Sequence, residues 1–228
     1  QGLNYLVPLL ITPYVVRALG PANFGLVAFS QSFAQYFTLL INFGFDLSAV
    51  REYASAKNDE ERQAIFNNVL TAKALLFSIS LLLFIGFSST VPSFRENITL
   101  HLCCFLFNIG SLLYQSWFFQ AAGIMVKSVV INMISRLLMA VGLLLLVKDP
   151  EDFILFGLLF SASQVLLGVA SITYIFRRFK FRFAFSFAGA KNQLKSGMII
   201  FVSSIMIALY TNTNVWYAVN DIAKMFHE

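Results

Sequence analysis

Seven apolar segments, each long enough to cross a lipid bilayer, dominate this sequence. A helix of about 20 apolar residues is sufficient to span a hydrocarbon core about 30 Å thick. Turn-forming pairs such as Gly20-Pro21 and Asp149-Pro150 separate the segments. The pattern predicts an all-α, polytopic membrane protein, a helical bundle with short loops. The predicted segments are residues 1–19, 24–44, 64–88, 100–122, 128–147, 153–176 and 197–217.

The composition favours the same class. Of the 228 residues, 58% are hydrophobic and only 12% are charged, and the mean hydropathy is +0.76. A soluble domain carries about 25% charged residues. The adjacent Cys103 and Cys104 lie in an apolar segment and are interpreted as small apolar residues. His101 and His227 have no cysteine or carboxylate at metal-ligand spacing, and no phosphate-binding loop occurs. We therefore expect no enzyme activity, no metal and no cofactor.

The loops differ in basic charge, which predicts the orientation in the membrane. One set of loops holds ten Lys and Arg, whereas the opposite set and the tail hold four. The N-terminus is therefore expected in the cytoplasm. The net charge of +5 follows from this bias and does not indicate nucleic-acid binding. The stretch RRFKFRF at 177–183 either sets topology alone or also attracts anionic lipid headgroups. The ten residues are Arg51, Lys57, Arg62, Lys127, Arg177, Arg178, Lys180, Arg182, Lys191 and Lys195.

Polar residues recur at helical spacing inside three segments. In the second, Gln31, Gln35, Thr38, Asn42 and Asp46 fall on one helix face, and in the fifth, Asn132 and Arg136 are four residues apart. Such faces form either hydrogen-bonded seams between helices or the wall of a hydrated cavity. An arginine in mid-membrane must face protein or water, so Arg136 favours the cavity. The fourth segment carries a similar row: His101, Cys104, Asn108, Ser111 and Gln115.

Other residues have two possible roles. Asp46 ends the polar face of the second segment, so we expect an acid at the cytoplasmic mouth of the cavity that pairs with a base or responds to a cation. Lys73 either faces the cavity or extends to the membrane surface. Arg17 either faces the cavity or anchors the outer interface. Pro8 and Pro13 remove helix hydrogen bonds, so the first helix is expected to bend, for alternating access or merely for packing.

Three sequence blocks carry a family resemblance. QGLNYLVPLLITPYVVRALGPANFGLVAFSQSFAQYF (1–37), FGFDLSAVREYA (43–54) and WFFQA (117–121) resemble the N-terminal half of bacterial O-antigen flippases of the Wzx type. LYTNTN (209–214) resembles the seventh helix of that family. These flippases belong to the polysaccharide-transporter branch of the multidrug/oligosaccharidyl-lipid/polysaccharide superfamily.

The resemblance implies a MATE-like transporter of two six-helix lobes around a central cavity. Such a transporter moves an undecaprenyl-pyrophosphate-linked oligosaccharide across the bacterial cytoplasmic membrane, for assembly with an O-antigen polymerase and a chain-length regulator. It implies cavity bases at Arg17, Arg51 and Arg136, and also at Lys73. The polar faces add the following candidate substrate-binding residues: Gln31, Gln35, Asn42, Asn108, Gln115 and Asn132. Asp46, Pro8 and Pro13 are candidates for gating or ion response.

The expected organisation is one lobe at 1–176, a basic cytoplasmic linker at 177–195, and a seventh helix with a tail at 196–228. The family continues with a second lobe where this sequence ends in VWYAVNDIAKMFHE, so we expect a fragment. Two other functions stay open. A cation-coupled drug antiporter on the same fold would require acids at depth, and a non-transporting scaffold of a polysaccharide assembly complex would fit a half-length chain.

Overall fold

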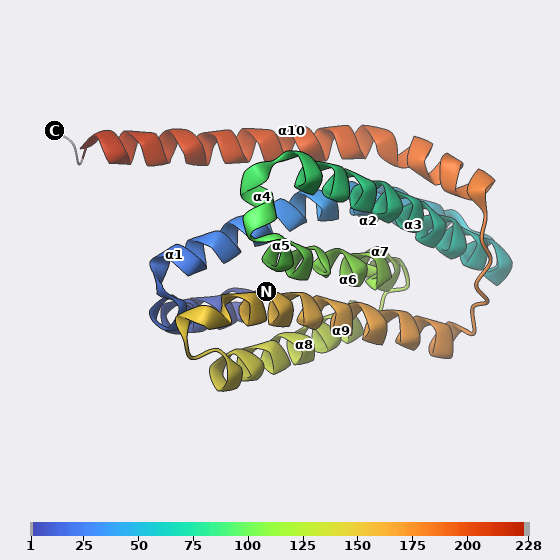
Figure 1. Ribbon diagram of the computed structural model, residues 1–228. Helices are drawn as coiled ribbons and strands as arrows, with labels where there is room; N and C mark the ends of the chain where they lie inside the picture. Colours follow the sequence, from blue (N-terminus) through green and yellow to red (C-terminus); the bar gives the residue numbers. More distant parts are fainter. Residues whose placement is uncertain (1, 226–228) are drawn as a thin grey trace.

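The computed structural model describes residues 2–225, with side chains for residues 11–207 except Ser93. Within this range the chain is helical, and the short helices α5–α7 lie between α3 and α9 (Figure 1). The elements are α1 (Gly2–Asn42), α2 (Phe45–Ser55), α3 (Asp59–Thr90), α4 (Pro92–Glu96), α5 (Ile98–Phe105), α6 (Phe107–Leu113), α7 (Ser116–Ala121), α8 (Met125–Leu146), the 3₁₀ turn η1 (Pro150–Asp152), α9 (Phe153–Phe179) and α10 (Phe187–Met225).

The described part of the chain contains five stretches that are long and apolar enough to cross a membrane. They match the first six predicted segments, because the first two fall in one stretch that begins at Ile11. The prediction of an all-α, polytopic membrane protein is thus confirmed. The predicted seventh segment falls in α10 and runs past residue 207, beyond the described side chains. The stretches are Ile11–Ser55, Asp59–Thr90, Ile98–Ala121, Met125–Leu146 and Pro150–Phe179.

The first two predicted segments are two helices joined at Gly20. This residue has φ 76° and ψ 159°, a conformation that only glycine adopts readily. Pro21 follows and disfavours a helical conformation in the residue before it. Figure 1 shows α1 changing direction at this joint. The observed change of direction is thus at Gly20; Pro13 lies in a helical stretch with an exposed side chain, and the Pro8 side chain lies outside the described residues.

A second joint separates α1 from α2 and lies against α10. Phe43 and Gly44 both have positive φ, 43° and 75°. A Cβ atom on Gly44 would lie 2.6 Å from Cγ2 of Ile200, and one on Gly197 would lie 2.8 Å from the Phe43 carbonyl oxygen. Glycines at these positions therefore allow the joint to approach α10 closely.

The fourth predicted segment is not one helix but three, α5, α6 and α7. The sequence gives no proline or loop signal there. α6 packs against α9 through two glycines: a Cβ atom on Gly168 would lie 2.6 Å from the Gly110 carbonyl oxygen. After α6 the chain passes through Tyr114, which is extended, and Gln115 before α7 begins. The break results from tertiary contacts, which are described below.

Two buried clusters hold the bundle together. An aromatic cluster joins α2, α3, α7 and α9 around Tyr53, Phe66, Trp117 and Phe118, whose rings contact one another at centroid distances of 5.4–6.2 Å. An aliphatic cluster that includes Val15 joins α1, α5, α8 and α9. On α8 most apolar side chains are exposed, as expected of a surface that faces lipid. Val15, Leu143 and Phe156 of the aliphatic cluster also line a cavity.

Candidate functional site: a polar cavity within the bundle

A cavity of about 740 Å³ opens between both parts of α1, the start of α2, and helices α6, α8, α9 and α10. Its volume lies within the range of small-molecule sites, about 300–1,000 Å³. The polar part of its wall combines amides, hydroxyls, one base and one acid. These residues are Thr12, Gln31, Gln35, Thr38, Asn42, Asp46, Asn132, Ser135, Arg136, Ser163, Gln164 and Ser204.

The rest of the wall is apolar. Val15 and Phe24 flank the Gly20 joint, and Leu143 and Phe156 lie near the connection between α8 and α9. The amides lie further along the same helices, away from the Gly20 joint. The wall is therefore amphiphilic: the end at the Gly20 joint is mainly apolar, whereas amides and apolar side chains such as Leu39 and Phe107 are mixed at the other end. The remaining apolar lining residues are Ile11, Leu39, Leu47, Phe107, Met139, Phe160, Leu167 and Ile200.

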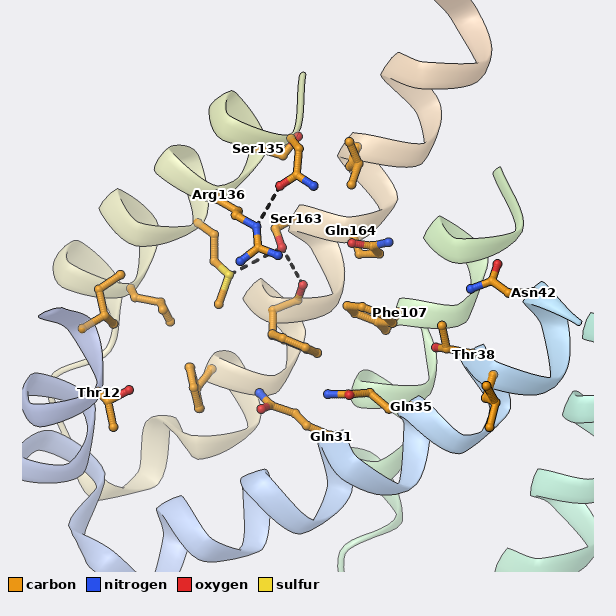
Figure 2. Close-up of a pocket in the computed structure, with 18 of the residues that line it drawn as sticks. Thr12, Gln31, Gln35, Thr38, Asn42, Phe107, Ser135, Arg136, Ser163 and Gln164 are labelled. Atoms are coloured by element: carbon orange, nitrogen blue, oxygen red, sulfur yellow. Dashed lines mark hydrogen bonds between the residues drawn. The ribbon is translucent and has the colours of Figure 1, made fainter. Parts of the chain in front are cut away.

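The polar face predicted for the second segment forms one wall of the cavity. Gln31, Gln35, Thr38 and Asn42 all line it from α1, and Figure 2 shows the four along one side. The amide nitrogen of Gln31 is buried and has no hydrogen-bond partner within the described part of the chain. A buried donor without a partner costs about 1–3 kcal/mol. This donor is therefore available for a ligand.

The base in this wall is Arg136 of α8. Its Nε donates a 2.7 Å hydrogen bond to Oδ1 of Asn132, one turn earlier on the same helix. Figure 2 shows Arg136 and Gln164 directed into the same space from α8 and α9. The half-buried guanidinium is thus oriented by an amide while it faces the cavity. The structure brings together the pair that the sequence placed in mid-membrane.

Asp46 is the acid of the cavity wall. It lies in the first turn of α2, so the break at Gly44 places it on a different helix from the α1 face that it was expected to extend. Its carboxylate is exposed and lines the cavity. It accepts a 2.6 Å hydrogen bond from the hydroxyl of Ser116, at the start of α7. A negative charge in a first helical turn is favourable, because it interacts with the free N–H groups.

Lys73 is in neither expected position. It is 1% exposed and does not line the cavity, so extension to the membrane surface is excluded. Its ammonium donates two 3.0 Å hydrogen bonds to the carbonyl oxygens of Ser111 and Tyr114. These carbonyls lie at the break between α6 and α7. Lys73 therefore stabilises the break between α6 and α7. The sequence predicted one continuous helix over residues 100–122, so this role of Lys73 could not be predicted.

The polar row of the fourth segment forms a seam between helices and not a cavity wall. Asn108 accepts a 2.9 Å hydrogen bond from Thr38 and donates to the Ala34 carbonyl. Gln115 is buried, donates to the Leu112 carbonyl at 2.7 Å and accepts from the indole of Trp117 at 2.8 Å. The structure therefore does not place Asn108 and Gln115 among the cavity residues.

Two further predicted bases lie outside the cavity. Arg17 is exposed and lies two residues after Val15, so it points to nearly the opposite side of the helix from that lining residue. Arg51 is exposed and lies one turn beyond Leu47 on α2. In the described part of the chain, Arg136 is thus the one base that lines the cavity. The cation-rich wall implied by the family resemblance is not formed by these residues.

Sequence reasoning missed the contribution of α9. Ser163 and Gln164 line the cavity near Arg136, and Ser163 donates a 2.7 Å hydrogen bond to the Phe160 carbonyl. Both interrupt an apolar segment, which was the available signal. These polar residues are few in an otherwise apolar segment, so they did not stand out.

Membrane-spanning helices around an amphiphilic cavity define a polytopic membrane protein with an internal cavity. Residues 1–221 match a family model described as "Polysaccharide biosynthesis protein", and the chain belongs to this family. It is 28% identical over 213 residues to a protein of Escherichia coli (strain K12) named "Putative O-antigen transporter", a match that covers 92% of this chain and 51% of that protein. A Shigella dysenteriae protein of the same name is 30% identical over 225 residues, covering 94% and 54%.

The chain therefore spans about half the length of the curated relatives that it matches. No solved structure matches it.

Proposed function

We propose that this chain forms one lobe of a flippase that carries a lipid-linked oligosaccharide across the bacterial cytoplasmic membrane by alternating access. The undecaprenyl-pyrophosphate-linked O-antigen unit is the proposed substrate. The two relatives named as O-antigen transporters support this class of function. The observation that carries the proposal is the amphiphilic cavity, whose polar and apolar parts match the two parts of such a substrate.

The polar part of the cavity is suited to sugars. Gln31, Gln35, Asn42, Asn132 and Gln164 supply amide donors and acceptors, which are the groups that hydrogen-bond to hydroxyls. Amides carry no charge, so they can bind a neutral sugar in the membrane without the cost of a buried ion. The unpartnered nitrogen of Gln31 is the most readily available donor.

Arg136 is suited to the phosphate of the same substrate. A guanidinium pairs with phosphate oxygens through two parallel, charge-assisted hydrogen bonds. An arginine at mid-membrane costs about 2.5–3.5 kcal/mol on insertion scales, and an anionic ligand offsets part of this cost. The apolar end around Phe24, Leu143 and Phe156 is suited to the polyprenyl chain.

The joints in the cavity wall supply possible hinges for alternating access. Both the Gly20 joint and the Gly44 joint lie in or next to the wall. We propose that the N-terminus faces the cytoplasm, as the distribution of basic residues indicates. A drug antiporter is less well supported, because the acid of the described cavity wall, Asp46, is exposed and already bonded to Ser116.

The test is complementation of a bacterial strain that lacks its O-antigen flippase, with the complete gene product carrying Arg136→Ala. Loss of two charge-assisted hydrogen bonds, each about 1.5–3 kcal/mol, should reduce transport at least tenfold. Surface O-antigen should decrease and the lipid-linked unit should accumulate inside.

The matched control is Arg51→Ala, which removes an exposed arginine outside the cavity and should complement like the parent. Membrane abundance of each variant is measured by immunoblot. Normal surface O-antigen with Arg136→Ala at equal abundance would contradict the proposal. A drug-resistance phenotype with unchanged surface glycans would favour the antiporter.

A further inference from the structure

The loop between α9 and α10, residues 180–186, combines exposed aromatic side chains with unpaired bases. It directly follows the candidate membrane span Pro150–Phe179, so it lies at the membrane surface. Figure 1 shows this loop beside the start of α3. It is not helical, and Lys180 at its start has a positive φ of 55°.

One part of the loop is fixed to the bundle. The Arg182 carbonyl accepts hydrogen bonds from Asn67 at 2.9 Å and from Gln63 at 3.2 Å, both on α3. The ring of Phe181 contacts Phe66 and Phe118 at centroid distances of 5.4 and 5.7 Å. The loop is therefore held in a defined position on the protein and does not hang free in water.

The next three aromatic side chains face outwards. Phe183, Phe185 and Phe187 are 58%, 51% and 64% exposed. Their rings contact one another in sequence, at centroid distances of 6.5 and 4.8 Å. These three phenylalanines, two on the loop and one at the start of α10, form an apolar patch, which is unfavourable in water and favourable in the acyl region of a bilayer.

The same segment is strongly basic. Residues 177–195 contain six Lys and Arg and no Asp or Glu. All six side chains are exposed, and none of them forms an ion pair in the described part of the chain, where the salt bridge is Arg62–Asp59. The bases lie on both sides of the aromatic patch: Arg177, Arg178, Lys180, Arg182, Lys191 and Lys195.

We propose that this segment is a binding surface for anionic phospholipid, with the phosphate headgroups on the bases and the acyl chains against the three phenylalanines. Charge complementarity selects the occupant: a zwitterionic lipid would satisfy the aromatic patch but would bring no net negative charge to balance the six bases. Each base near an anionic membrane surface strengthens binding roughly fivefold. Orientation of the chain in the membrane would explain the basic residues of this segment, but it does not require exposed phenylalanines between them. The proposal is independent of what the cavity transports.

The experiment places a tryptophan reporter in the patch, Phe185→Trp, in the full-length protein reconstituted into nanodiscs of phosphatidylcholine with a minority of phosphatidylglycerol. Brominated acyl chains quench tryptophan on contact. In one sample the phosphatidylglycerol is brominated, and in the other an equal amount of phosphatidylcholine is brominated. The parent protein, which lacks the reporter, gives the background from its own tryptophans.

Brominated phosphatidylglycerol is expected to quench the reporter several-fold more than brominated phosphatidylcholine. High salt should reduce this preference, because it screens exposed charges. The triple change Arg178→Gln, Lys180→Gln and Arg182→Gln should make the two lipids equal. The matched control, Arg95→Gln with Lys148→Gln, removes exposed bases from the opposite loops and should leave the preference intact.

Three results would overturn the proposal. Equal quenching by the two lipids in the unmodified reporter protein would show no selection for the anionic headgroup. No quenching by either lipid would show that the patch does not contact acyl chains. A preference that survives both high salt and the triple change would show that these bases do not cause it. The salt series needs no charge variant, so the proposal stays testable if the triple variant does not fold.

Discussion

Replacing Lys73 with methionine is expected to destabilise the protein strongly. Methionine keeps most of the length and packing of the lysine side chain but removes its ammonium. The ammonium is buried and makes two 3.0 Å hydrogen bonds, to the Ser111 and Tyr114 carbonyls at the break between α6 and α7. Both carbonyls would then remain in a buried site without this donor.

The magnitude follows from these two contacts. A hydrogen bond to a charged group contributes about 1.5–3 kcal/mol net, so two give about 3–6 kcal/mol. For a chain of this size, 1 kcal/mol corresponds to roughly 2–4 °C in melting temperature, so the decrease should be on the order of 10 °C. Because the break also positions Ser116, which bonds to Asp46, the cavity wall at Asp46 should loosen as well.

The assay is thermal unfolding of the purified protein in detergent, with Lys57→Met as the control. Lys57 is exposed in the connection between α2 and α3, so its replacement should change the melting temperature by no more than a degree or two. An unchanged melting temperature for Lys73→Met would refute the argument that this lysine stabilises the helix break.

Three further changes separate structural residues from cavity residues. Gly44→Ala should lower stability by about 1–3 kcal/mol in the same assay, because φ is 75° and the added Cβ would lie 2.6 Å from an Ile200 methyl. The control Gly25→Ala adds a Cβ with nothing within 4 Å and should leave stability unchanged. Equal effects of the two changes would contradict this argument. Asn108→Leu should destabilise by a similar amount, since it removes the seam to α1, and a gain in stability would contradict that role. Gln31→Leu should leave stability unchanged or higher, because the buried Gln31 nitrogen has no partner in the described part of the chain. The same change should reduce O-antigen export in the complementation assay, because Gln31 lines the cavity. Full export would show that Gln31 is not part of the substrate site.

Apolar length and helical periodicity made much of the fold predictable. A membrane helix must satisfy its backbone internally, so apolar segments of sufficient length give the spans directly. The face containing Gln31, Gln35 and Asn42 was visible because polar residues at steps of three and four fall on one side of a helix. Arg136 was visible because a charge at mid-membrane requires protein or water around it.

The breaks were not predictable, because their causes are distant in sequence. The break at Tyr114 depends on Lys73 and on the close approach of Gly110 to Gly168, contacts between residues 38–58 positions apart. The polar row around Asn108 has the same spacing as the row around Gln31. Periodicity shows that a face is polar, but only the packing of neighbouring helices decides whether it becomes a seam or a cavity wall.

Site-specific photo-crosslinking in the cavity tests the central claim most directly. A photoreactive amino acid replaces Ser163, which lines the cavity, or Leu138, which is 56% exposed on the outer face of α8. Cells that make the lipid-linked oligosaccharide are irradiated, and the purified protein is probed for attached sugar. We expect attachment at position 163 and none at position 138. No attachment at 163, or equal attachment at both positions, would contradict the assignment of this cavity as the substrate site.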